Sequence, residues 1–138
     1  QFIKHHEGLA FYTIGQRKGL EIGGGFSTSG EPWFVADKRI ESNELVVVQG
    51  DHTLLYHNNL NASNPHWIEN PPILPLACTA KIRYRQQSQS CLVSSAENGQ
   101  LKVTFDQPQR AITPGQSIVF YDDDICLGGG IIESRGNE

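Results

Sequence analysis

The chain has 138 residues, enough for one ordinary domain or two small ones, and 38% of them are hydrophobic. With 19% charged residues, this composition excludes a disordered chain, and no apolar run reaches the roughly 18 residues of a membrane helix. A net charge of −4 argues against a general nucleic-acid binder, although residues 76–116 are locally basic.

The first third is rich in glycine, which favours short elements and turns. Residues 11–14 fit either a short strand or a single helical turn. Between Gly15 and Gly19 the sequence predicts a polar loop of three residues, Gln16, Arg17 and Lys18.

Two β-rich runs follow, at residues 33–37 and 44–49, and they predict a hairpin with a polar turn. Residues 54–56 predict another short strand.

A break follows, because residues 58–75 hold four of the seven prolines (Pro65, Pro71, Pro72 and Pro75). Proline has no N–H to donate, so we expect few helices or central strands there. We therefore expect a small β-rich central domain at 1–65, a linker at 66–75 and a carboxy-terminal domain at 76–138.

The last part predicts strands at the spacing of a small barrel. In 77–85, Cys78, Ala80, Ile82 and Tyr84 alternate with Thr79, Lys81, Arg83 and Arg85. Runs at 91–96 and 101–105 flank Asn98-Gly99, a strong hairpin signal. With those two residues as the turn, Leu92, Ser94 and Ala96 would face Phe105, Val103 and Leu101.

Runs at 117–121 and 125–132, joined by an acidic turn at 122–124, predict a second hairpin. The three glycines at 128–130 predict a bulge or close backbone packing. The fold class is therefore mainly β. We expect a closed antiparallel barrel, because closure buries one face of these strands and leaves no edge strand unpaired.

Signatures of catalysis are absent from the sequence, which has no nucleotide-binding loop and no metal-ligand spacing. Cys78, Cys91 and Cys126 are far apart along the sequence and form no C-x-x-C pair, and we expect three reduced thiols in a cytoplasmic protein. The chain also begins at Gln1 and contains no Met, which favours a fragment and leaves open a central domain incomplete at its start.

One constellation fits a binding role. Lys81, Arg83 and Arg85 would project from one strand face about 6.6 Å apart, close to the spacing of phosphates in RNA. Tyr84 and Tyr121 offer aromatic surfaces for an unpaired base. An ordinary basic outer face on a barrel explains the same pattern.

Residues 6–20, HEGLAFYTIGQRKGL, resemble the H-x-G-L-x-x-Y-T-I-G-Q-R-K-G-L signature of the tRNA-specific 2-thiouridylases. Further blocks of the resemblance follow in order along nearly the whole chain: PWFV at 32–35, KIRYRQ at 81–86, TPGQ at 113–116, VFY at 119–121 and CLGGGII at 126–132.

The resemblance implies a tRNA-uridine 2-sulfurtransferase that makes 2-thiouridine at the wobble position of the tRNAs for Lys, Glu and Gln. In that family an amino-terminal ATP pyrophosphatase domain binds ATP with Mg, and sulfur arrives from a relay donor protein. This chain resembles the central domain and the barrel, so we expect no bound cofactor, no catalytic residue and no activity of its own. Its expected partners are tRNA, through the anticodon region, the missing domain and the sulfur donor, but no membrane.

The resemblance also implies tRNA contacts at Arg83, Tyr84 and Gln116. The less certain contacts are Lys81, Arg85, Arg17, Lys18 and Gln16. Two alternatives remain: the RNA-binding barrel of another RNA-modifying enzyme or translation factor, and a non-catalytic scaffold or protein-interaction module.

Overall fold

The computed structural model describes residues 2–5, 14, 33–39, 44–49 and 53–137. The chain divides into two compact units, Gln1–Tyr56 and His57–Glu138. Within the described ranges, no helix is long and apolar enough to cross a membrane.

The first unit contains an antiparallel sheet in the order β1-β3-β2. Its strands are β1 (Phe2–His5), β2 (Trp33–Arg39) and β3 (Glu44–Gln49). The hairpin predicted from the two β-rich runs is confirmed by the pairing of β2 with β3. Strand β1, which pairs with the other edge of β3, was not anticipated.

The strand predicted at 54–56 is wrong. Thr53–Leu55 form a single 3-10 turn, η3, and the next strand begins at Tyr56. Leu55 is fully buried in a cluster with Ala36, Val46 and Val48. A 3-10 turn can bury a single apolar side chain such as Leu55, so the apolar residues at 54–56 did not indicate a strand.

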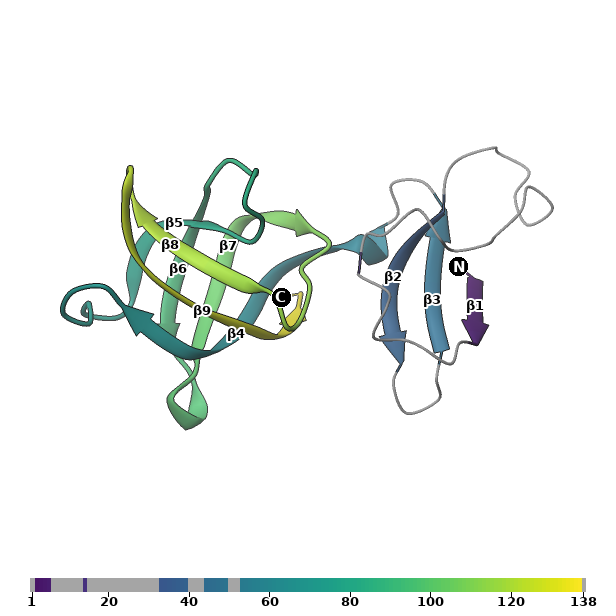
Figure 1. Ribbon diagram of the computed structural model, residues 1–138, viewed down its shortest axis with the longest axis horizontal. Coiled ribbons are helices and arrows are strands. Elements are labelled where there is room, and N and C mark those ends of the chain that lie inside the picture. Colours follow the sequence, from purple (N-terminus) through teal and green to yellow (C-terminus); the bar gives the residue numbers. More distant parts are fainter. Residues whose placement is uncertain (1, 6–13, 15–32, 40–43, 50–52, 138) are drawn as a thin grey trace. The chain divides into compact units, whose positions relative to one another are not determined.

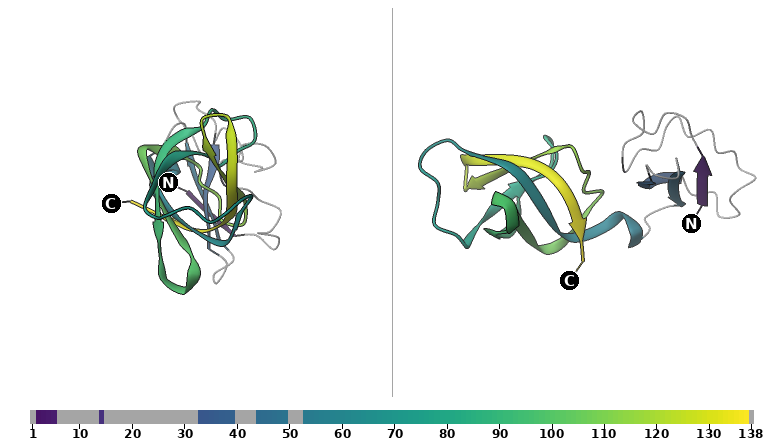
Figure 2. Two further views of the ribbon diagram at one scale, coloured as in Figure 1. Left: turned by 90° about the vertical axis from the view of Figure 1, so that its left-hand side faces the viewer. Right: turned by 90° about the horizontal axis from the view of Figure 1, so that it is seen from below.

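The second unit is a closed barrel of six strands in the order β4-β7-β6-β5-β8-β9, which can be followed in Figure 1 and from two other sides in Figure 2. The strands are β4 (Tyr56–Trp67), β5 (Leu76–Lys81), β6 (Gln89–Ser95), β7 (Leu101–Arg110), β8 (Ser117–Asp122) and β9 (Ile125–Gly136). The prediction of a mainly β chain with a closed antiparallel barrel is confirmed.

Strand β4 runs through the segment where we expected few central strands. It pairs with β9 on both sides of Pro65, and the register shifts between Ser63 and His66. Asn64 has φ +48° and both Asn64 and Pro65 are exposed, so a bulge removes the proline from the ladder. Residues 66 and 67 of the expected linker therefore end β4, and residues 68–75 connect β4 to β5 within the barrel. The chain divides into its two units between Tyr56 and His57.

The hairpin of β6 and β7 has a register one residue away from the predicted one. Cys91 lies opposite Phe105 and Val93 opposite Val103. The turn holds three residues, Glu97–Gly99 (η4), and is closed by a hydrogen bond from the Ala96 N–H to the Gln100 carbonyl oxygen, 2.9 Å. Because side chains alternate along a strand, the extra turn residue exposes Leu92 and buries Val93.

The hairpin of β8 and β9 is present, and the glycines of β9 mark close backbone packing as predicted. A Cβ on Gly128 would lie 2.1 Å from the His66 carbonyl oxygen, and one on Gly129 would lie 2.5 Å from that of Ile118. These positions let β9 pass tightly between β4 and β8.

Side chains from all six strands fill the barrel interior. Leu60, Ala80, Val93, Val103, Ile118, Phe120 and Ile132 are all almost completely buried. Trp67 stacks on Phe120 with ring centroids 5.6 Å apart, on the inside of the barrel wall. These side chains are apolar, so the barrel interior contributes packing and stability.

Candidate nucleic-acid interface

A cavity of about 310 Å³ opens on the barrel where β5 ends beside β8. Its volume falls in the usual range of small-molecule sites, about 300–1,000 Å³. Eight residues line it: Lys81, Ile82, Arg83, Tyr84, Gln116, Ser117, Val119 and Tyr121. Two of them are cations and none is an acid, so the cavity suits an anionic ligand.

Strand β5 stops at Lys81, and the residues that follow turn back toward β6. The side chain of Gln86 holds this turn, because its Oε1 accepts a hydrogen bond from the Ile82 N–H at 3.0 Å. Its Nε2 donates to Oε1 of Gln109, also at 3.0 Å. Gln109 is 4% exposed and donates to the Gln107 carbonyl oxygen at 2.9 Å.

The end of β5 overturns part of the predicted alternation. Cys78, Ala80 and Ile82 do face the core, but Tyr84 is 94% exposed. Residues 82–86 lie in a turn, so Arg83 and Arg85 do not continue the strand face of Lys81. The same turn places Arg83 and Tyr84 together on the wall of the cavity, which regular alternation would have prevented.

The guanidinium of Arg83 is anchored. Its Nη2 donates a hydrogen bond of 2.6 Å to the carbonyl oxygen of Ala111. Partial burial of this group lowers the pKa of Arg83 from its ordinary value, and the neighbouring Arg110 cation lowers it further. An arginine keeps its proton at neutral pH despite such shifts. Arg83 therefore presents a fixed positive charge at the cavity.

Gln116 comes from a different loop, between β7 and β8. Its backbone N–H donates to the Thr113 carbonyl oxygen at 3.2 Å, and its carbonyl oxygen accepts from the Ile132 N–H at 2.9 Å. Gly115 donates to the Ile132 carbonyl oxygen at 2.8 Å. The backbone is thus fixed to β9, while Gln116 stays exposed and lines the cavity.

Lys81 of β5 and Tyr121 of β8 both line the cavity and contact each other. The ammonium group of Lys81 lies 5.1 Å from the centre of the Tyr121 ring, a cation–π contact. Tyr121 lies opposite Thr79 in the ladder. This contact holds the lysine beside the aromatic surface instead of leaving it free in solvent.

The structure thus brings together Lys81, Arg83, Tyr84 and Gln116. Arg85 is exposed but does not line the cavity. Gln16, Arg17 and Lys18 lie outside the described residues. Sequence reasoning missed Ser117 and Val119, and also the support from Gln109, whose role depends on contacts with residues far away in sequence.

No group of three or more His, Cys, Asp or Glu side chains within the described ranges is placed to hold a metal ion. Cys78, Cys91 and Cys126 are free thiols.

Comparison with known protein families defines the class of both units. Residues 57–132 match the model described as "Aminomethyltransferase beta-barrel domain", and residues 1–49 match "tRNA methyl transferase PRC-barrel domain". The first match covers more than half of the chain and coincides with the six-stranded barrel.

Several curated relatives carry the name tRNA-specific 2-thiouridylase MnmA. The protein of Vesicomyosocius okutanii is 76% identical over 135 residues, which is 98% of this chain and 37% of that protein. Those of Ruthia magnifica and Hydrogenovibrio crunogenus are 75% and 55% identical, each over 98% of this chain and 37% or 36% of their own length. The chain belongs to the tRNA-specific 2-thiouridylase family, and it spans somewhat over a third of the length of these relatives.

Proposed function

We propose that this chain is the tRNA-binding region of an enzyme that makes 2-thiouridine at the wobble position of the tRNAs for Lys, Glu and Gln. The name of its relatives supports the reaction, and the cavity at the end of β5 supports the binding role. ATP with Mg and the sulfur-relay donor belong, in this proposal, to an amino-terminal pyrophosphatase domain. The intact enzyme would work in the cytoplasm.

The observation that carries the proposal is the meeting of four predicted contact residues in one cavity. Arg83 and Lys81 supply positive charge for phosphate oxygens, and Arg83 is already oriented by Ala111. Tyr84 and Tyr121 supply ring faces on which an unpaired base can stack. Gln116 adds an amide that can both donate to and accept from a base edge.

The arrangement suits unpaired RNA such as the anticodon loop, because a splayed base and its phosphate need an aromatic face beside a cation. In the first unit, Gln16, Arg17 and Lys18 are proposed as further contacts on the strength of the sequence signature alone. Arg85 is proposed as an outlying cation that adds charge near the same loop.

The test is the affinity for tRNA of three forms of the chain: wild type, Arg83→Ala and Lys102→Ala. Lys102 lies on β7 and does not line the cavity, so its variant removes an equal charge elsewhere. We expect Arg83→Ala to weaken binding about tenfold, as for the loss of one charge-assisted contact. Equal losses in both variants would show that the cavity binds no better than the rest of the basic surface, and an unchanged affinity of Arg83→Ala would favour the scaffold alternative.

A further inference from the structure

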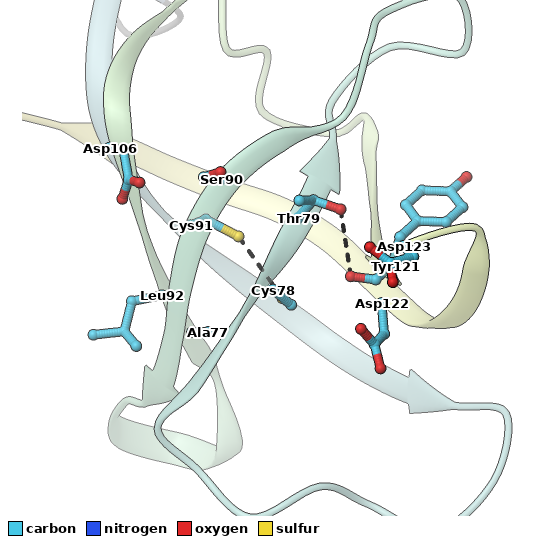
Figure 3. Close-up of a pocket in the computed structure, with 10 residues that line it drawn as sticks. All are labelled: Ala77, Cys78, Thr79, Ser90, Cys91, Leu92, Asp106, Tyr121, Asp122 and Asp123. Carbon is cyan, nitrogen blue, oxygen red and sulfur yellow. Dashed lines mark hydrogen bonds between the residues drawn. The ribbon is translucent and has the colours of Figure 1, made fainter.

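A second cavity, of about 460 Å³, lies on the other side of Tyr121 and is shown in Figure 3. Its walls come from β5, β6, β7 and β8, and Cys78 and Cys91 are among its lining residues. Three carboxylates, those of Asp106, Asp122 and Asp123, also line it, so its charge is opposite to that of the first cavity. The proposed tRNA contact does not use this site.

Cys78 and Cys91 are direct partners in the antiparallel ladder of β5 and β6. Their sulfur atoms lie 3.9 Å apart, and the dashed line from Cys91 to Cys78 in Figure 3 marks this contact across the two strands. Direct cross-strand partners have Cα atoms about 4.5–5.5 Å apart, inside the range of about 4.4–6.8 Å that a disulfide tolerates. Rotation of the side chains would therefore suffice to join the two sulfur atoms.

The two thiols are not equivalent. A hydrogen bond from the Cys91 thiol lowers the pKa of Cys78, although burial and the Asp122 carboxylate oppose that shift. The same contact raises the pKa of Cys91, and so do its burial and the Asp106 carboxylate. Cys78 is also the more exposed of the pair. It is therefore the thiol that an external reagent reaches first, with Cys91 beside it as the second thiol.

We propose that Cys78 and Cys91 form a dithiol modification site, which a hydroperoxide converts to a cross-strand disulfide. The Cys78 thiolate attacks one peroxide oxygen and breaks the O–O bond, which gives a sulfenic acid and releases hydroxide or an alkoxide that takes a proton from water. The Cys91 sulfur then attacks the Cys78 sulfur and displaces the sulfenic hydroxyl as water, with the thiol proton. Two sulfur atoms are oxidised by two electrons in total, and one peroxide is reduced.

The position of this bond gives the site a structural consequence. Cys78 and Cys91 enclose residues 79–90, which include Lys81, Arg83, Tyr84 and Gln86. A disulfide would tie β5 to β6 at the base of the turn that presents the first cavity. The modification itself does not depend on the proposed function.

Trypsin separates the three cysteines, because the peptides 40–81, 86–102 and 111–135 contain one each. The chain is treated with hydrogen peroxide in native buffer, blocked with N-ethylmaleimide, digested and analysed by mass spectrometry. We expect peptides 40–81 and 86–102 to be linked and two hydrogens lighter than their sum, while 111–135 carries the maleimide. Cys126→Ser should leave the yield of that link unchanged.

Cys91→Ser provides the complementary variant, since serine keeps the size of the side chain but cannot resolve a sulfenic acid. In that variant the link should disappear, and dimedone should trap a sulfenic acid on peptide 40–81. Two results would overturn the proposal: maleimide on both Cys78 and Cys91 after oxidation of Cys126, or a link to peptide 111–135 in place of the expected one.

Discussion

Tyr84 shows how a single residue can separate binding from stability. Its side chain is 94% exposed, so it adds almost nothing to the core. An exposed tyrosine beside Arg83 on the wall of a cavity is suited to stacking on a base.

We therefore predict that Tyr84→Ala lowers the affinity for tRNA by about 1–3 kcal/mol, the usual contribution of one base–aromatic stack. Tyr84→Phe should bind like wild type, because it keeps the ring face. Filter binding measures the affinities, and urea unfolding should give the same free energy for all three forms. An alanine variant that binds normally would remove Tyr84 from the interface.

Gly128 represents the opposite case, a residue with a structural role only. A Cβ at this position would lie 2.1 Å from the His66 carbonyl oxygen, and backbone atoms cannot move away as a side chain can.

Gly128→Ala should therefore lower the free energy of unfolding by about 3 kcal/mol or more, as forced overpacking does. Gly136→Ala is the matched control on the same strand, because the nearest atoms to its Cβ all belong to the side chain of Asn59, with Oδ1 at 3.1 Å. Urea denaturation distinguishes the two. If both variants have the stability of wild type, β9 does not pack against β4 as closely as described.

At the scale of the element, the register of β6 with β7 decides which side chains form the core. Val93 is fully buried, whereas Leu92, the next residue, is 44% exposed. A two-residue turn at Asn98-Gly99 would reverse these environments.

Replacing each of the two by alanine tests the register directly. Val93→Ala should lower the free energy of unfolding by about 2 kcal/mol, from lost burial and a small cavity. Leu92→Ala should change it by about 0.5 kcal/mol, as for most surface substitutions. Thermal or urea unfolding of the two variants measures these changes. A larger loss for Leu92→Ala than for Val93→Ala would instead support the register with a two-residue turn.

This hairpin also shows which features of the fold a sequence can predict. Alternation of apolar residues identified β5, β6, β7 and β8 because the period of two is imposed by the strand itself. The number of residues in a turn is not imposed in that way: Asn98-Gly99 suits a two-residue turn, yet Glu97 joins it. The effect of Pro65 was not predictable for a related reason. It lies in a bulge of β4, where its missing N–H removes no hydrogen bond from the ladder with β9.

The candidate site was predictable in composition but not in geometry. The resemblance named Arg83, Tyr84 and Gln116, but regular alternation placed the first two on opposite faces. Only the turn held by Gln86 and Gln109 brings them to one wall. That turn depends on the hydrogen bond between Gln86, in the turn after β5, and Gln109, at the end of β7, which lie more than twenty residues apart along the chain.

For the whole molecule, the proposal assigns binding to this chain and chemistry to another domain. With tRNA, ATP, Mg and a sulfur donor, the 138-residue chain should release no pyrophosphate and form no 2-thiouridine. A pyrophosphate assay checks this, with heat-denatured chain as the background. A rate of pyrophosphate release above that background would contradict the assignment of the chemistry to another domain, if the release is lost when Cys78, Cys91 or Cys126 is replaced.

The charge of the whole molecule limits how strongly it can bind. The net charge is −4, and only five of the eleven basic residues lie within 76–116, at 81, 83, 85, 102 and 110, so this region can neutralise only a few phosphates at once. Binding to tRNA should be weak and should fall as salt rises, because each contact releases counterions.

The most direct test of the central claim is therefore the salt dependence of tRNA binding by wild type, Arg83→Ala and Gln116→Ala. Each phosphate contact contributes about 0.7–0.9 to the slope of log affinity against log salt concentration. Arg83→Ala should reduce the slope by about that amount, while Gln116→Ala should weaken binding at an unchanged slope, because a neutral amide releases no counterion. Identical affinities and slopes in all three forms would show that the cavity at the end of β5 does not contact tRNA.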